Sequence, residues 1–331
     1  MTTTTSLPLS STKLDGHIAA VVTEGLLSRP KWLPAWLFYD AAGSRLFDQI
    51  TELPEYYLTR TERRILAANA AEMIGLAADA DALRIVELGA GSADKTRILL
   101  NAAVNRQDTV LYEPVDVSAS ALGEAQQRIE REISGVVVCP RVIDYTRDFS
   151  LEAPFYGERR LVLYIGSSIG NFEPDEALGL LTKVRAALGP RDSILLGVDQ
   201  VKDERTLLDA YDDAAGVTAA FNRNILARIN RELGANFDPE AFEHRAAWNA
   251  VKSCIEIHLE SRVAQTVRVP SPDPDFDLRI RFARGETIHT ENSYKYRPGQ
   301  VEALVESAGF VAAQTWTDER GWFAVCLARA A

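Results

Sequence analysis

Two glycines and a flanking acid form the first segment of the chain that could bind a ligand. The segment Val86–Thr96 reads VELGAGSADKT. Gly89 and Gly91 allow a tight turn and a close approach of a ligand to the backbone, and the helix expected after them would offer free N–H groups to an anion. A nicotinamide-binding fingerprint would need a glycine at position 94, where this chain has Asp94. A strand–turn–helix joint without a ligand is the simpler alternative.

Two further candidate positions follow strand-like runs. Tyr112–Asp116 contains two acids, Glu113 and Asp116, and a carboxylate at this place in a sheet can accept both hydroxyls of a ribose. The residues leave open which acid serves, or whether either is only a solvated strand end. Asp144 and Tyr145 end the next run. The Asp144 carboxylate can accept a hydrogen bond from an adenine amino group, or it can simply cap a helix.

A fourth candidate, Tyr164–Phe172, reads YIGSSIGNF. Small residues such as Gly166 clear space at the carboxyl edge of a sheet, where ligands bind in this architecture. The Asn171 side chain offers a donor and an acceptor, which suits a zwitterionic ligand. The alternative is a glycine-rich turn that binds nothing.

The elements that must position these residues alternate between strand and helix over residues 84–200. Helices are expected from Ser92, from Ser118 and from Pro174, the last ending before Gly189. The expected strands are 84–88, 109–115, 136–143, 160–166 and 193–199. This alternation predicts an α/β fold with a parallel sheet covered on both faces.

The pattern changes after residue 200. Residues 202–235 are expected to be helical, and 254–262 and 277–283 alternate as half-exposed strands, expected to be antiparallel. A helix at 298–308 that stops at Gly309, and a strand pair at 312–318 and 322–328, would return to the first sheet.

These patterns predict two domains. One is a Rossmann-like sheet domain of residues 61–200 and 293–331. The other is an α+β domain of residues 1–60 and 201–292, in which the aromatic N-terminal segment packs with the insertion as a substrate-binding lid. The Thr/Ser-rich start, residues 1–16, is expected to be a flexible tail.

Composition excludes several classes of protein. The 331 residues are 47% hydrophobic and 25% charged, as in ordinary globular proteins and unlike disordered ones. The net charge of −11 argues against a nucleic-acid partner, and no apolar run approaches the ~18 residues of a membrane span. Dispersed cysteines and histidines favour a reducing, cytoplasmic location without a metal site. A monomer is expected.

Longer motifs give the chain a family resemblance. These are 38–62 (FYDAAGSRLFDQITELPEYYLTRTE), ELGAGSADKT, YIGSSIGNF, LLGVDQVKD, 210–224 (AYDDAAGVTAAFNRN) and 290–298 (TENSYKYRP). They occur in order from about residue 25 to the end, and with them the chain resembles the histidine Nα-methyltransferases of ergothioneine biosynthesis. That resemblance implies a class I methyltransferase sheet, S-adenosylmethionine (SAM) as cofactor, S-adenosylhomocysteine as its product, and trimethylation of L-histidine to hercynine.

The resemblance also implies roles for individual residues. It favours Asp116 over Glu113 for the ribose. It makes Tyr39 a candidate to orient the amine, and Phe47 a candidate to pack against the methylated ammonium or simply to fill the core. The implied SAM-binding residues are Gly89, Gly91, Lys95, Asp116, Asp144 and Tyr145. The implied histidine-binding residues are Tyr56, Gly166, Asn171, Tyr211, Thr218, Glu291 and Ser293.

One residue departs from the pattern of close relatives, and three other functions stay open. Ile257 stands where those relatives carry a flexible methionine near the side-chain pocket, which puts selectivity among aromatic amino acids in question. The alternatives are a methyltransferase for tryptophan or a thiolated histidine, a nicotinamide oxidoreductase, and a SAM-binding module without activity. The acid and hydroxyl of Glu291 and Ser293 match an imidazole better than an indole.

Overall fold

The chain forms two compact units. The structure is a computed structural model and describes residues 11–91, 93–146, 149–151, 155, 157–270 and 278–330. Unit 1 is assembled from Met1–Phe47, described from Ser11, with Asp212–Ala247 and Glu256–Glu291. Unit 2 comprises Asp48–Tyr211, Trp248–Ile255 and Asn292–Ala331, described to Ala330. The sequence-based division had its boundaries after residues 60, 200 and 292.

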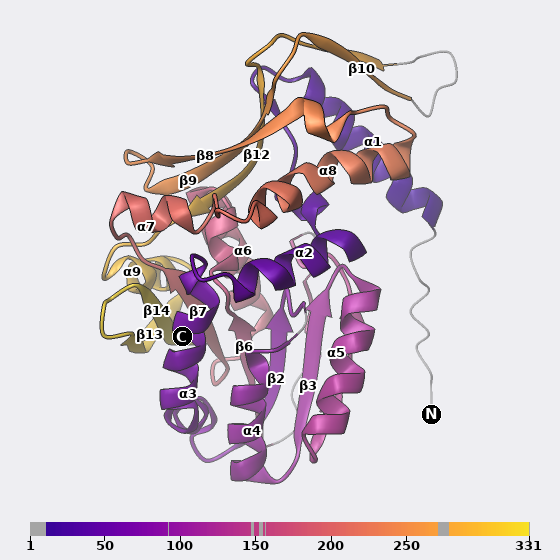
Figure 1. Ribbon diagram of the computed structural model, residues 1–331. Helices are drawn as coiled ribbons and strands as arrows, with labels where there is room; N and C mark the ends of the chain where they lie inside the picture. Colours follow the sequence, from indigo (N-terminus) through magenta and orange to yellow (C-terminus); the bar gives the residue numbers. More distant parts are fainter. Residues whose placement is uncertain are drawn as a thin grey trace. The chain divides into compact units, whose positions relative to one another are not determined.

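Unit 2 is built on an eight-stranded sheet in the order β13-β14-β7-β6-β2-β3-β4, with β5 also paired to β3 (Figure 1). Strands β2 to β7 are parallel to one another, and β14 is antiparallel to both β7 and β13. The predicted α/β sheet and the return of the C-terminal strands to it are therefore confirmed. The strands are β2 (Ala82–Leu88), β3 (Val110–Asp116), β4 (Val136–Val138), β5 (Arg141–Val142), β6 (Glu158–Tyr164), β7 (Ser193–Asp199), β13 (Phe310–Thr317) and β14 (Phe323–Ala330).

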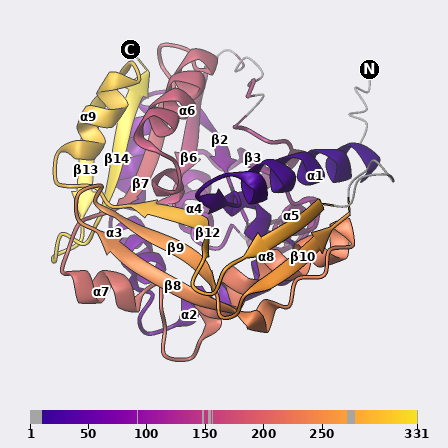
Figure 2. The ribbon, with the colours of Figure 1, turned by 90° about the horizontal axis from the view of Figure 1, so that it is seen from above.

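Helices cover both faces of this sheet. Figure 1 shows α4 in front of the strands and α6 behind them, and Figure 2 shows α6 beside α9. Apolar side chains from β2, β6 and β7 pack with those of α6 and α9 in one buried cluster, which fixes the strand ends in place. The helices of unit 2 are α3 (Tyr57–Ala78), α4 (Thr96–Gln107), α5 (Ala119–Glu132), η2 (Ser168–Asn171), α6 (Pro174–Ala187), α7 (Glu204–Asp209) and α9 (Gln300–Ser307).

Local sequence signals explain where the helices begin. The Ser118 hydroxyl accepts a hydrogen bond from the backbone N–H of Ala121, as predicted for an N-cap. Pro174 occupies the first turn of α6, where a missing N–H costs nothing, and Glu173 and Glu176 complete a capping box there. The other predicted cap, Ser92, lies outside the described residues.

Two local expectations were wrong. The single strand expected at 136–143 is divided into β4 and β5, because Pro140 has no N–H to continue the ladder after Cys139 donates to the Tyr112 carbonyl at 2.8 Å. The tail expected over residues 1–16 was too long, since α1 (Ser11–Leu27) already begins at Ser11. Residues 1–10 lie outside the described part.

Unit 1 contains a second, smaller sheet in the order β1-β12-β9-β8, with β1 parallel to β12, and a separate antiparallel pair, β10 and β11. No helix in the described part of the chain combines the length and apolar character needed to cross a bilayer. The elements are α1, β1 (Lys31–Trp32), η1 (Ala35–Phe38), α8 (Val217–Leu233), η3 (Pro239–Ala241), β8 (Phe242–Asn249), β9 (Cys254–Ser261), β10 (Gln265–Val269), β11 (Leu278–Phe282) and β12 (Thr287–Tyr294). Helix α2 (Ala41–Glu52) and strands β8, β9 and β12 each contribute residues to both units.

Candidate functional site

The glycine turn after β2 has the backbone conformation that its sequence requires. Gly89 and Gly91 have φ of 67° and 49°, values that residues with a side chain rarely adopt. The Gly89 N–H donates to the Val115 carbonyl at 2.8 Å, and the Gly91 N–H donates to an Asp116 carboxylate oxygen at 3.1 Å. The turn is therefore fixed to the carboxyl end of the neighbouring strand β3.

The two acids of β3 have different surroundings. Asp116 is only half-buried, and its second oxygen accepts from the Ser118 N–H at 2.9 Å. Glu113 is buried and forms an ion pair with Arg84 at 3.1 Å. Because its charge is already neutralised inside the protein, Glu113 has a structural role, and Asp116 remains the ribose candidate.

Tyr145 is brought against the glycine turn. A Cβ atom added at Gly89 would lie 3.3 Å from the Tyr145 hydroxyl, so the first and third motifs meet as their strand ends predict. The Tyr145 ring packs edge-on against Tyr164 at 6.0 Å between centroids. Burial raises the pKa of Tyr145 to about 12, which keeps its hydroxyl protonated. The neighbouring Asp144 accepts from the Thr146 N–H at 3.0 Å and from its hydroxyl at 2.5 Å.

A buried acid that the sequence analysis did not select, Glu62 on α3, joins the first and fourth motifs. Its carboxylate forms an ion pair with Lys95 and accepts from the Gly166 N–H at 2.8 and 3.0 Å. A Cβ at Gly166 would lie 3.1 Å from the Lys95 ammonium, and one at Gly197 would collide with Glu62 at 2.1 Å. A side chain at position 197 would therefore displace the Glu62 carboxylate from its contacts with Lys95 and Gly166. Glu62 is the last residue of the quoted motif 38–62, but the sequence alone does not indicate its partners on other elements.

Glu87, next to the turn, is a second buried acid. Its carboxyl group accepts from the Thr96 hydroxyl at 2.6 Å and from the Tyr112 hydroxyl. Burial raises the pKa of Glu87 to about 7. These bonds attach the end of β2 to the start of α4 and to β3. They therefore stabilise the two ends of the segment that contains the glycine turn.

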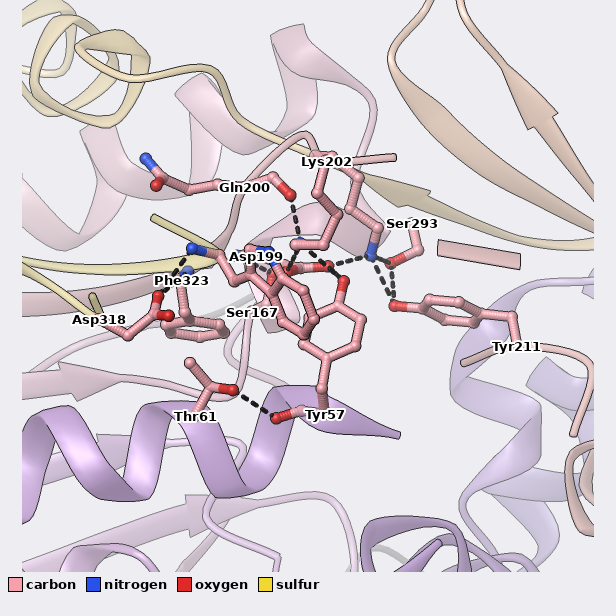
Figure 3. A network of polar contacts seen from close by, with 12 residues as sticks. Tyr57, Thr61, Ser167, Asp199, Gln200, Lys202, Tyr211, Ser293, Asp318 and Phe323 are labelled. Carbon is pink, nitrogen blue, oxygen red and sulfur yellow. Dashed lines mark hydrogen bonds and ion pairs between the residues drawn. The ribbon is translucent and has the colours of Figure 1, made fainter. Parts of the chain in front are cut away.

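Two predicted substrate residues, Tyr211 and Ser293, touch each other. Their hydroxyl oxygens are 2.8 Å apart (Figure 3). The Tyr56 ring lies edge-on to that of Tyr211, with 6.2 Å between the ring centroids. The ammonium of Lys295 donates to Tyr211 at 2.7 Å and to Ser293 at 2.9 Å. Since the two hydroxyls adjoin, they can meet the same group of a small ligand.

The contacts extend to a buried group that we call the lysine cluster: Asp199, Lys202, Lys295 and Tyr57. Asp199 pairs with Lys202 at 2.6 Å and with Lys295 at 2.9 Å, and it accepts from the Tyr57 hydroxyl at 2.7 Å (Figure 3). Burial lowers the pKa of Lys202 to about 8. The sequence reasoning missed this cluster, although Lys295 stands between two aromatic residues in the quoted motif 290–298.

Asn171 lies in a turn that reaches the same region. The turn residue Gly170 approaches the backbone of Tyr294 so closely that an added Cβ would lie 2.7 Å from the Tyr294 carbonyl. Ser167, at φ 60°, accepts from the Asp199 N–H through its hydroxyl at 2.9 Å. The fourth motif is thus held beside the segment that carries Ser293 and Lys295.

The remaining predicted residues belong to unit 1. Tyr39 and Phe47 pack against each other and against Phe221, with centroids 5.8 to 5.9 Å apart. Phe47 therefore packs in an aromatic cluster, and its contact with a methylated ammonium stays a prediction. The Thr218 N–H donates to Asp213 at 2.7 Å at the start of α8, and Glu291 is half-buried on β12.

No metal-binding group emerges from the described residues: nowhere in them do three or more His, Cys, Asp or Glu side chains lie close enough to hold an ion.

Comparison with known proteins gives one family over nearly the whole chain. Residues 18–330 match the family described as histidine-specific methyltransferase, SAM-dependent. The chain is 48% identical over 307 residues to a protein of Mycolicibacterium smegmatis named histidine N-alpha-methyltransferase, covering 93% of each. A protein of the same name from Mycobacterium tuberculosis is 46% identical, with 95% of each chain covered.

A longer fungal protein extends the comparison. The ergothioneine biosynthesis protein 1 of Neurospora crassa is 30% identical over 297 residues, which are 87% of this chain and 32% of the fungal one. With the glycine turn, Asp116 and Tyr145 assembled at the carboxyl edge of the sheet, the match over residues 18–330 shows that the chain belongs to the histidine-specific, SAM-dependent methyltransferase family.

Proposed function

We propose that this protein transfers three methyl groups from SAM to the α-nitrogen of L-histidine and so forms hercynine, an early step of ergothioneine biosynthesis. The observation that carries the proposal is the identity of 46–48% with two histidine N-alpha-methyltransferases along nearly the full length of each chain. The geometry of unit 2 agrees with a SAM site and with an amino-acid site beside it.

The residues at the carboxyl edge of the sheet fit SAM. The left-handed Gly89 and Gly91 leave room for a ligand against the backbone, and no atom lies within 4 Å of a Cβ added at Gly91. Asp116 is half-exposed beside them, and its carboxylate suits the two ribose hydroxyls. We propose that Asp144 and Tyr145 hold the adenine side and that Lys95 holds the methionine side. SAM supplies a methyl group on a sulfonium centre, which a neutral amine can attack directly.

The proposed substrate residues favour binding without a positive charge at the carboxylate. Asn171, Tyr56 and Tyr211 are neutral hydrogen-bond donors, so they can hold the carboxylate without repelling the nearby sulfonium. Ser293 and Glu291 are proposed for the imidazole, and Glu291 would accept a ring N–H. Gly166 and Thr218 are proposed as further substrate-binding residues.

The protein's task in the reaction is mainly positioning. The substrate ammonium must lose a proton before it attacks, and Tyr39 is proposed to orient the amine, directly or through water. A growing quaternary ammonium needs an apolar and polarisable surface. The ring of Phe47 can supply one through cation–π attraction worth about 0.5–2 kcal/mol.

The test is incubation of the full-length protein with SAM and a mixture of all twenty amino acids, followed by mass spectrometry. We expect a gain of three methyl groups on histidine alone, and NMR of the product should place all three on the α-nitrogen. Methylation of a ring nitrogen would contradict the proposed orientation. Methylation of tryptophan instead would contradict the substrate, and binding of SAM with no product from any amino acid would indicate a module without activity.

A monomeric state, a cytoplasmic location and the absence of a nucleic-acid partner remain part of the proposal. Light scattering and cell fractionation can test the first two.

A further inference from the structure

Glu62 is a completely buried acid whose partners lie at the carboxyl edge of the main sheet. Its side chain is 0% exposed, whereas that of its ion-pair partner Lys95 is 18% exposed. The same carboxylate accepts from the Gly166 N–H at 2.8 and 3.0 Å. Lys95 is therefore the member of the ion pair that a ligand can reach, and Glu62 acts on a ligand through its partners.

The fold provides a place for this charged group. Glu62 comes from α3, Lys95 immediately precedes α4, and Gly166 follows β6. Gly197 on β7 leaves the space that the carboxylate fills, because a Cβ atom added there would collide with it. A buried carboxylate is unfavourable unless it is paired and hydrogen-bonded. The ion pair with Lys95 is therefore built into the junction of these elements.

Glu62 is the acid that directly compensates the charge of Lys95. Asp94, the residue before Lys95, forms ion pairs with two arginines. Burial is the main cause of the raised pKa of Glu87, and Lys95 lowers that pKa whereas Glu62 raises it. The ammonium and the carboxylate thus act on their surroundings with opposite signs, so that together they add little net charge to the site.

The cofactor makes this compensation important. SAM carries a sulfonium charge that S-adenosylhomocysteine lacks, so it is one unit more positive than the product formed from it. An uncompensated ammonium beside the methionine side would repel SAM but not the sulfonium-free product. Such a site would retain the product in preference to the methyl donor.

We propose that Glu62 is a positioning residue that neutralises Lys95 and thereby sets the selectivity of the cofactor site for SAM over S-adenosylhomocysteine. The inference rests on the proposed function, in which Lys95 holds the methionine side of SAM. The competing role is purely structural: Glu62 would only connect α3, the start of α4 and the end of β6. That role becomes an outcome of the test.

Asp192 offers a matched control at the opposite edge of the same sheet. Its side chain is 2% exposed and pairs with Arg160 at 2.6 Å. It also accepts from the Arg160 N–H at 2.7 Å, near the start of β6. Glu62 and Asp192 are thus buried acids that each combine one cationic partner with a backbone donor. A general effect of breaking a buried ion pair would appear in both variants.

The experiment measures the dissociation constants of SAM and S-adenosylhomocysteine by calorimetry, without histidine, in full-length wild type, Glu62→Gln and Asp192→Asn. Both amides keep the shape of the acid and remove its charge. We expect Glu62→Gln to lower the ratio of SAM affinity to S-adenosylhomocysteine affinity about five- to thirtyfold, as one uncompensated charge would. Asp192→Asn should leave the ratio unchanged, and Glu62→Asp, which keeps the charge, should restore it.

Two further variants separate charge from structure. Lys95→Met should weaken the binding of both ligands. Combining it with Glu62→Gln removes both charges, so the ratio should return to the wild-type value. If circular dichroism shows that Glu62→Gln does not fold, Gly197→Ala replaces it. Its methyl group would displace the carboxylate from Lys95, and we expect a smaller fall of the ratio in the same direction.

Three results would overturn the inference. Equal weakening of SAM and S-adenosylhomocysteine binding in Glu62→Gln would show a structural role. A similar fall of the ratio in Asp192→Asn would show a general effect of losing a buried charge. Unaltered affinities in Lys95→Met would remove Lys95 from the cofactor site, and with it this part of the proposed function. A protein that shows the expected ratios but does not methylate histidine supports the inference and contradicts the proposed substrate.

Discussion

Two polar regions of unit 2 are built in opposite ways. The region around the glycine turn consists of two left-handed glycines, whose N–H groups donate to Val115 and Asp116, and of the half-exposed Asp116 itself. The lysine cluster consists of side chains that are almost completely buried and that satisfy one another. The first region is therefore built from backbone conformation beside a partly exposed acid, whereas the second is built from buried side chains that bond to one another.

The two regions also differ in how the chain supplies them. The glycine turn comes from one continuous segment and the ends of two adjacent strands. The lysine cluster combines residues from three segments that are far apart in the sequence, at Tyr57, at Asp199 and Lys202, and at Lys295. A region made of backbone conformation tolerates few substitutions at its glycines, and a region made of side chains depends on mutual charge compensation.

The largest effect, on cofactor affinity, is expected from Gly89→Val, which changes the glycine turn. A β-branched residue at φ 67° is strained, and its Cβ would lie 3.3 Å from the Tyr145 hydroxyl, where it also narrows the space for the cofactor. We expect S-adenosylhomocysteine to bind about a hundredfold more weakly in calorimetry. Gly123→Val on α5 is the control, since no atom lies within 4 Å of its added Cβ. Equal S-adenosylhomocysteine affinities in the two variants would show that the glycine turn is not part of the cofactor site.

The next effect concerns Glu291→Ala, which extends the comparison to an acid of unit 1. If Glu291 accepts the imidazole N–H, its loss removes a charge-assisted hydrogen bond worth about 1.5–3 kcal/mol. Competition between histidine and tryptophan should show kcat/KM for histidine reduced about ten- to over a hundredfold, with tryptophan affected less. Glu260→Ala, an acid on β9 that pairs with Arg245, is the control. An unchanged histidine-to-tryptophan ratio would mean that Glu291 does not read the ring.

A smaller effect should appear in the pH dependence of stability beneath the glycine turn. Burial raises the pKa of Glu87 from 4.5 to about 7, so between these values the folded state binds more protons than the unfolded state. The Glu87 contribution to the free energy of unfolding is full below pH 4.5 and falls as pH rises towards 7, by at most about 1.4 kcal/mol per pH unit. Urea unfolding of Glu87→Gln should lack this decline. The same slope in wild type and variant would contradict the assignment.

An effect of similar size and opposite sign is expected in the lysine cluster. Burial lowers the pKa of Lys202 from 10.5 to about 8, so between these values the unfolded state binds more protons. The Lys202 contribution should therefore increase stability as pH rises from 8 towards 10.5, by at most about 1.4 kcal/mol per pH unit. Unfolding of Lys202→Met should lack this rise, and the exposed Lys183→Met should keep it. A decline with pH that is specific to Lys202 would show that the lysine is stabilised, not destabilised, in its charged form.

The sequence predicted the sheet and its carboxyl edge because local patterns determine them. Apolar runs such as Ser193–Asp199 and caps such as Ser118 need no knowledge of distant residues. The meeting of Gly89 with Tyr145 followed from parallel strands, whose carboxyl ends lie on one edge.

The lysine cluster and Glu62 could not be predicted in this way. A lysine in a sequence is usually solvated, and nothing local indicates that Lys295 will be buried against Asp199, almost a hundred residues earlier in the chain. Glu62 is similarly defined by partners on other elements, Lys95 and Gly166. The burial and pairing of such residues can be recognised only once the fold shows which distant segments lie together.

The position of β14 has a consequence for how the protein is made. This strand, Phe323–Ala330, lies between β7 and β13 inside the sheet, and it pairs with β7 from Phe323↔Asp199 to Arg329↔Ser193. Residues up to 330 must therefore leave the ribosome before the sheet can close around β7. Until then the apolar edge of β7 has no partner, and during synthesis it is open to pairing with other chains.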